Sequence, residues 1–129
     1  MQTTSNPTAP IRIAMLGCAH TGHASSYLNA LNHLATAKLF AIYDPDAQRA
    51  QAYASQFQVK ATSNLEELLS SENLQAVIIC AQTNEHKEIA LAAARSGLPI
   101  LCEKPIASNL ADAQAILSAC QMAGVLLQT

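Results

Sequence analysis

Clusters of positive charge are absent from this sequence, and their absence excludes the usual chemistry of nucleic-acid binding. Lysine and arginine together number 7 against 9 aspartates and glutamates, so the formal net charge is −2. No basic run offers a surface that follows a phosphate backbone. We therefore expect no nucleic-acid partner.

Long apolar runs and paired cysteines are missing as well. No segment approaches the roughly 18 consecutive apolar residues that cross a bilayer, so we expect no membrane partner. The four cysteines form no C-x-x-C motif, and three of them lie in or beside apolar stretches, where a reduced thiol packs as a small hydrophobic group. This usage is typical of a reducing cytoplasm, where we expect the protein to be located. Residues 1–10, MQTTSNPTAP, lack the features of a signal peptide and are expected to form a disordered tail.

Hydrophobic residues make up 50% of the chain, enough for one domain over residues 11–129 to bury a core without metals or disulfides. Short apolar runs alternate with amphipathic stretches, and continuous hydrophobicity is typical of parallel strands buried on both faces. Right-handed crossovers wind such an alternation into an α/β fold, a doubly wound parallel (Rossmann) sheet with helices on both faces. The expected strands are 11–16, 38–43, 58–61 (the weakest), 75–80, 98–102 and 125–127, and the expected helices are 22–35, 46–57, 64–70, 85–96 and 108–123.

Several helix ends have recognisable signals. Ser63 followed by Glu66 fits a capping box at the start of the third helix. Gly97 and Gly124 stand where a helix ends in a left-handed backbone conformation.

The stretch LGCAHTGH, which follows the first apolar run, nearly spells the dinucleotide fingerprint G-x-G-x-x-G. Gly17 permits the tight turn, and Gly22 is expected to let the helix pack close to the strand. Backbone N–H groups around His20, Thr21 and Gly22 face an anion at the positive end of the helix. Ala19 replaces the middle glycine, and its methyl group predicts weaker but retained binding of the pyrophosphate.

Asp44 directly follows the second apolar run, 22 positions after Gly22. A carboxylate there accepts hydrogen bonds from both adenosine ribose hydroxyls and repels the 2′-phosphate of NADP, which predicts a preference for NAD. In the other interpretation, Asp44 caps the helix that begins near Asp46. The combination of strand, turn, helix and acid favours the nucleotide site.

Polar residues also follow the fourth strand (TNEH, 83–86) and the fifth (EKP, 103–105). The carboxyl ends of parallel strands are where open α/β sheets bind ligands. With these motifs the chain resembles the glucose-fructose oxidoreductase, inositol dehydrogenase and rhizopine-catabolism (Gfo/Idh/MocA) family. The resemblance covers residues 11–129, and E-K-P after the fifth strand is its specific motif.

The resemblance implies a role for each of these residues. Glu103 corresponds to a contact with the nicotinamide ribose, and Lys104 to the group that reaches the reacting hydroxyl and helps to move its proton. A lysine suits that place, because an ammonium stabilises a developing alkoxide. Pro105 is expected to hold the lysine backbone in a fixed turn, with a cis bond as one means. The residues implied to line the cofactor beside its ring are Thr83, Asn84 and His86.

Plainer interpretations stay beside these. Lys104 is also consistent with a solvated surface lysine, and His86 with a residue in the first turn of a helix. No carboxylate or cysteine accompanies His20 and His23 at ligand spacing, so we expect no metal.

Members of the family usually carry a second α/β domain that holds the substrate, whereas nothing here follows Thr129. The expected function is therefore the cofactor domain of an oxidoreductase that transfers a hydride between a nicotinamide cofactor and a sugar, cyclitol or related polyol. The 129 residues alone are expected to be inactive, because a lone cofactor domain leaves the ring facing solvent. The alternative is a non-catalytic dinucleotide-binding or interaction module, which has no chemical need for Lys104. Assembly into a homo-oligomer stays open.

Overall fold

A computed structural model of the protein describes residues 8–129, and the part of the expected tail in residues 1–7 lies outside it. Residues 8–10 are exposed and have no regular secondary structure. The strands are β1 (Ile11–Leu16), β2 (Ala37–Tyr43), β3 (Lys60–Thr62), β4 (Ala76–Ile79), β5 (Ile100–Cys102) and β6 (Leu127–Gln128). The helices are α1 (Thr21–His33), α2 (Ala47–Phe57), α3 (Leu65–Leu69), the 3₁₀ turn η1 (Thr83–Glu85), α4 (His86–Arg95) and α5 (Leu110–Ala123).

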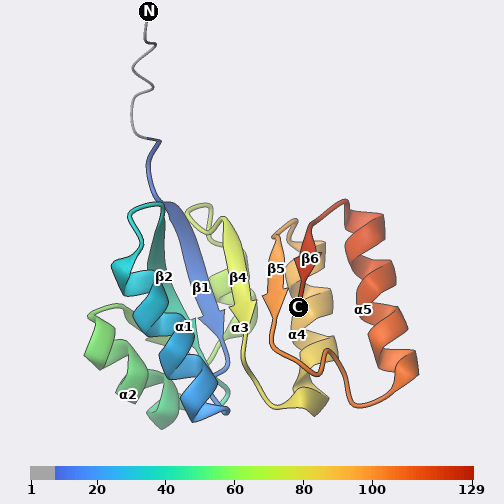
Figure 1. Ribbon diagram of the computed structural model, residues 1–129, viewed down its shortest axis with the longest axis horizontal. Coiled ribbons are helices and arrows are strands. Elements are labelled where there is room, and N and C mark those ends of the chain that lie inside the picture. The colour runs from blue at the N-terminus through green and yellow to red at the C-terminus, as the bar shows by residue number, and fades with distance from the viewer. Residues whose placement is uncertain (1–7) are drawn as a thin grey trace, which may run out of the picture.

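The six strands form one parallel sheet in the order β3-β2-β1-β4-β5-β6 (Figure 1). This order confirms the predicted doubly wound Rossmann fold. The strand order reverses between β1 and β4, and the loops that leave their carboxyl ends diverge at that point. Ligands of open α/β sheets bind in the resulting crevice.

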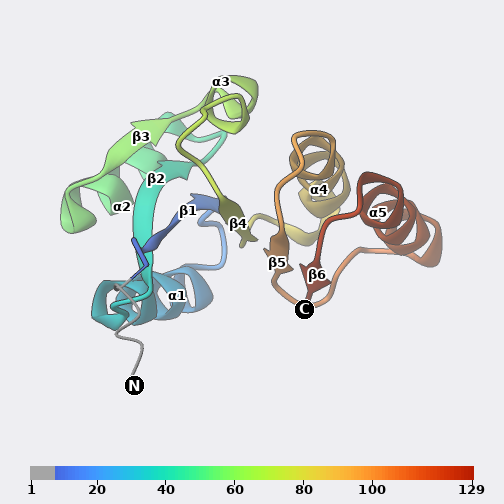
Figure 2. The same cartoon turned by 90° about the horizontal axis from the view of Figure 1, so that it is seen from above.

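Helices cover both faces of the sheet, as Figure 2 shows for α1 on one side and α4 and α5 on the other. Alternate residues of β1 enter different cores, because successive side chains of a strand point to opposite faces. Ala14 and Leu16 pack with α3, α4 and α5, whereas Met15 packs with α1 and α2. The sheet therefore has two buried cores, one on each face.

The ends of several elements differ slightly from the predictions. Asn64 caps α3, since its side chain accepts a hydrogen bond from the backbone N–H of Glu67 at 3.2 Å, so the capping box predicted at Ser63 is wrong. Asparagine caps helices as well as serine does, and here it stands one residue further along. The third strand begins later than predicted because Gln58 ends α2 in a left-handed conformation (φ 56°).

The two glycines expected at helix ends do adopt positive φ angles. Gly97 has φ 73° after α4, and Gly124 has φ 67° at the end of α5. The predictions of left-handed backbone at these positions are confirmed.

Candidate functional site

The carboxyl ends of β1, β2, β4 and β5 meet at one edge of the sheet, toward which the arrowheads of β1 and β4 point in Figure 1. All the site residues predicted from the sequence lie on the loops or first helical turns at this edge. Gly17, Ala19, His20, Thr21 and Gly22 follow β1, Asp44 follows β2, Thr83, Asn84 and His86 follow β4, and Glu103, Lys104 and Pro105 follow β5.

The turn after β1 depends on the absence of a side chain at Gly17. This residue has φ +88°, and a Cβ atom there would lie 2.5 Å from both the Cα and the Cβ of Ala81. Its N–H donates to the carbonyl of Tyr43 at 2.7 Å, which fixes the turn against β2. The predicted tight turn at Gly17 is confirmed, with a close approach to the end of β4 as a second reason for glycine.

Gly22 has a different setting from the one expected. A Cβ atom built on it meets no heavy atom within 4 Å, so the prediction that it lets α1 pack close to the sheet is wrong. Gly22 lies in the exposed first turn of α1, where the helix has already left the strand. Its missing side chain keeps that surface open.

The start of α1 has free backbone donors. His20 occupies the N-cap position without a capping hydrogen bond from its side chain, and the first turn holds no acidic residue. By contrast, Asp46 caps α2 and Asn109 caps α5 through their side chains. The first N–H groups of α1 therefore face the crevice with the positive end of the helix dipole.

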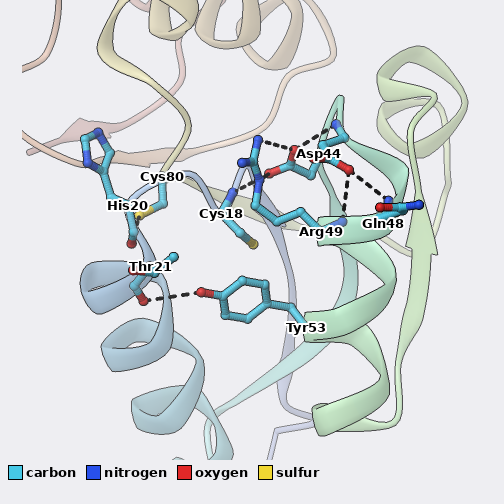
Figure 3. Close-up of polar contacts among 9 residues, drawn as sticks. Cys18, His20, Thr21, Asp44, Gln48, Arg49, Tyr53 and Cys80 are labelled. Carbon is cyan, nitrogen blue, oxygen red and sulfur yellow. Dashed lines mark hydrogen bonds and ion pairs between the residues drawn. The ribbon is translucent and has the colours of Figure 1, made fainter.

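Asp44 is fully buried and ties the ends of β1 and β2 to α2. Its Oδ2 accepts hydrogen bonds from the backbone N–H of Cys18 at 2.8 Å and from Nε of Arg49 at 3.0 Å. Its Oδ1 accepts from the N–H of Asp46 at 2.9 Å and from Nη2 of Arg49 at 3.0 Å (Figure 3). Capping of α2 falls to Asp46, which accepts from the N–H groups of Gln48 and Arg49.

Arg49 is one residue of this edge that the sequence reasoning missed, and it contacts Asp44 through two hydrogen bonds. The hydrogen bond from its guanidinium to Asp44 raises the pKa of this arginine above its ordinary value. A signal was present in the sequence, because Arg49 stands five positions after Asp44, in the first turn of the predicted helix. Close by, the Tyr53 hydroxyl donates to the carbonyl of Thr21 at 3.4 Å and links α2 to α1 (Figure 3).

Glu103 is only 6% exposed, and α1 contacts it through His23. Its Oε1 accepts from the backbone N–H of Lys104 at 3.1 Å, and its Oε2 lies 3.3 Å from Nδ1 of His23. Burial alone would raise the pKa of the carboxyl, but hydrogen bonds from Tyr27, from the Lys104 backbone and from His23 outweigh it and lower that pKa. Burial and the bond to Glu103 raise the pKa of Tyr27 to about 12. His23 and Tyr27 were missed, although residues four apart share a helix face.

Lys104 and Pro105 are both exposed at the mouth of the crevice. The peptide bond between them is cis, one of the means by which Pro105 was expected to fix the turn. Thr83 and Asn84 form η1 beside them, Thr83 half-buried and Asn84 exposed.

His86 is fully buried at the first residue of α4, so its ring presents no surface to a bound molecule. Its Nε2 lies 3.1 Å from the carbonyl oxygen of Ala81, and its Nδ1 lies 3.1 Å from that of Ile106. The Cys102 thiol lies 3.5 Å from the same Nδ1. His86 thereby joins the loop after β4 to the loop after β5, on which Lys104 is carried.

The cysteines are buried free thiols, as expected for packing groups. Burial raises the pKa of Cys18 and of Cys102 to about 12 and that of Cys80 to about 11. Within residues 8–129, no three metal-ligating side chains gather at one place. Over the same residues, no helix combines the length and the apolar character needed to cross a membrane.

Comparison with known proteins assigns the chain to a family. The model of an oxidoreductase family with an NAD-binding Rossmann fold, Gfo/Idh/MocA, matches residues 11–129. The chain belongs to this family. The resemblance inferred from the turn after β1 and from E-K-P is thus confirmed.

Among its relatives, D-apiose dehydrogenase of Paraburkholderia graminis is 30% identical over 97% of this chain and 33% of its own length. Myo-inositol 2-dehydrogenase of Thermotoga maritima is 33% identical over 92% of this chain and 35% of its own length. The crystal structure of an oxidoreductase from Desulfitobacterium hafniense, described as NADPH-dependent, superposes with a TM-score of 0.86 at 27% identity, covering 92% of this chain and 34% of the other. The chain therefore spans about a third of the length of these relatives.

Proposed function

We propose that this chain is the dinucleotide-binding part of an oxidoreductase that transfers a hydride between a nicotinamide cofactor and a sugar, cyclitol or related polyol. The observation that carries the proposal is the uncapped start of α1 at the Gly17 turn, with the E-K-P loop beside it at the end of β5. The names of the two dehydrogenases above support the class of substrate.

In this proposal the cofactor pyrophosphate binds at the free N–H groups of His20, Thr21 and Gly22. Helix N-termini favour such anions through both their donors and their dipole. The adenosine ribose lies toward Asp44, and the nicotinamide ring lies toward the loop after β5, where Thr83 and Asn84 line it. When bound, the nicotinamide supplies the centre that accepts or donates the hydride.

Lys104 serves the proton half of the reaction. During oxidation of a secondary alcohol, the amine of Lys104 would take up the proton that the hydroxyl releases. In the reverse direction an ammonium stabilises the developing alkoxide and returns the proton. Glu103 contacts the nicotinamide ribose in exchange for its bond to His23, and Pro105 fixes the turn that presents Lys104.

Asp44 alone predicts a preference for NAD, through repulsion of a 2′-phosphate. Arg49 neutralises that carboxylate, so the charge that would repel a 2′-phosphate is compensated. The competing function, a dinucleotide-binding module without chemistry, leaves the exposed Lys104 without a purpose.

The test is calorimetric titration of the purified chain with NADH and with NADPH. Binding of either, with amide chemical-shift changes at residues 17–22, supports the proposal, and binding of neither contradicts it. Ala19→Gly should tighten binding by up to about 1 kcal/mol, because a methyl group that crowds the phosphates is removed. Ala123→Gly, at the exposed end of α5, is the matched control and should leave the affinity for NADH and NADPH unchanged.

The proposal also includes inactivity of the 129 residues by themselves. The crevice offers one wall of a reaction site, and hydride transfer needs a water-poor cleft that holds the substrate as well. Steady NADH production from inositol or glucose by this chain would contradict that part of the proposal while leaving cofactor binding intact.

A further inference from the structure

The carboxylate of Asp44 has no acceptor position left for a ribose. An ionised carboxylate accepts about four hydrogen bonds, two at each oxygen. Here Oδ1 and Oδ2 each accept one backbone N–H and one N–H of Arg49, at 2.8 to 3.0 Å. A ribose hydroxyl that donates to Asp44 must therefore displace one of these donors.

Arg49 is the donor that can leave. The N–H groups of Cys18 and Asp46 belong to the Gly17 turn and to the start of α2, so their release would deform the backbone. The Arg49 side chain is 32% exposed, against 1% for Asp44, so a change of rotamer can move it away without a change in the backbone. The ion pair is consequently the part of this site that has two states.

The guanidinium also has donors to spare. Arginine carries five N–H groups, and Asp44 takes one from Nε and one from Nη2. In residues 8–129, no side chain or carbonyl accepts from the other three. Figure 3 shows Arg49 pointing to Asp44 beside Cys18, which lies in the turn between β1 and α1. An anion at this place would meet a fixed cation with three free donors, the geometry that favours forked Arg–phosphate contacts.

We propose that the Asp44–Arg49 pair selects between the two forms of the cofactor by closing or opening. With the pair closed, Arg49 lies between two anions and binds the 2′-phosphate of NADPH. With the pair open, Asp44 accepts the ribose hydroxyls of NADH. The protein thus accepts both cofactors, and Arg49 is the residue that determines their ratio. This inference rests on the proposed dinucleotide binding.

The experiment compares two probes that differ only in the 2′-phosphate, adenosine 2′,5′-bisphosphate and AMP, alongside NADPH and NADH. Arg49→Gln should weaken the bisphosphate and NADPH by about 10- to 100-fold, the loss of hydrogen bonds to a charged group. The same variant should leave AMP and NADH within about threefold, or tighten them, because Asp44 is released. The affinity of Arg49→Lys for the bisphosphate and NADPH should lie between those of the unaltered chain and Arg49→Gln, since lysine keeps the charge but lacks the forked guanidinium.

Arg95→Gln is the matched control, because it removes the same charge from the exposed last turn of α4, at the opposite edge of the sheet. Its effect on the affinities for all four compounds should be small and equal. Thermal unfolding of each variant shows whether the protein remains folded. If Arg49→Gln does not fold, the NMR signal of the Arg49 Nε–H in the unaltered chain decides. That signal should stay protected from exchange with NADPH and lose protection with NADH.

Equal losses for both probe types in Arg49→Gln, or unchanged affinity for the bisphosphate, would overturn the inference. The same holds for an Nε–H signal that responds identically to NADH and NADPH. Failure of the unaltered chain to bind any of the four compounds would instead contradict the proposed function itself.

Discussion

Replacement of Gly17 by alanine tests the tightest contact at the carboxyl edge of the sheet. The new methyl group imposes two penalties. The backbone is held at φ +88°, where a Cβ atom costs about 1 to 2 kcal/mol. The methyl group also overlaps the buried backbone of Ala81, whose N lies 2.7 Å from the new Cβ, and such overpacking costs about 1 to 3 kcal/mol.

The sum, about 2 to 5 kcal/mol, is a large share of the roughly 5 to 15 kcal/mol that stabilises a typical domain. Urea unfolding followed by circular dichroism measures it. With an m-value of about 2 kcal/mol per molar, the midpoint should fall by about 1 to 2.5 M.

Two other glycines separate the penalties. Gly97→Ala meets nothing within 4 Å but has φ +73°, so it should show the backbone cost alone. Gly22→Ala has neither problem and should be neutral or stabilise α1 by about 0.5 to 1 kcal/mol. If Gly17→Ala loses no more stability than Gly97→Ala, the close approach of the turn to Ala81 is refuted.

The other predictions concern a helix cap, an acid and the lysine. Asn64→Ala should lower the free energy of unfolding by about 1 kcal/mol while Ser63→Ala leaves it unchanged, and the reverse order in thermal unfolding would restore the predicted capping box. The pKa of Glu103 is lowered in the folded protein, so its stabilising contribution is complete above the ordinary glutamate pKa and is lost as the pH falls through the lowered value. Tyr27→Phe should raise the pKa of Glu103 and move acid unfolding to higher pH. An unchanged titration of the Glu103 carboxyl in the NMR spectrum of this variant would disprove the prediction. In a longer chain that includes a substrate domain, Lys104→Ala should lower kcat by about 10²- to 10⁴-fold with NADH affinity within a few-fold, whereas unchanged turnover would make Lys104 a surface residue.

Elements with a strong local pattern could be predicted from the sequence. The apolar runs identify the strands because burial on both faces leaves no polar positions, and a glycine after the first run identifies the turn. The predicted site residues lie where a motif and a strand end coincide, as at Asp44 and Glu103.

What could not be predicted depends on packing between separate elements. The partner of Asp44 is Arg49 because α2 turns back over the strand end, and the partners of Glu103 come from α1, some 80 residues earlier in the chain. The burial of His86 likewise follows from the position of the loop that carries Ile106. The sequence shows a glycine at position 22 but does not show whether α1 lies close to the sheet there.

The central position of β1 also has a consequence for the order in which the protein is made. Its first neighbour, β2, follows shortly after it, but its other neighbour pairs Ile13 with Ala76, 63 residues later. A growing chain therefore carries β1 with one bare edge for much of its synthesis, a state that invites mispairing with other strands. The contact of Gly17 with Ala81 forms later still, and the loop after β5 follows it, so the crevice is completed only after Lys104 has been joined. A nascent chain released before that point would contain Asp44 and α1 but would lack a complete crevice.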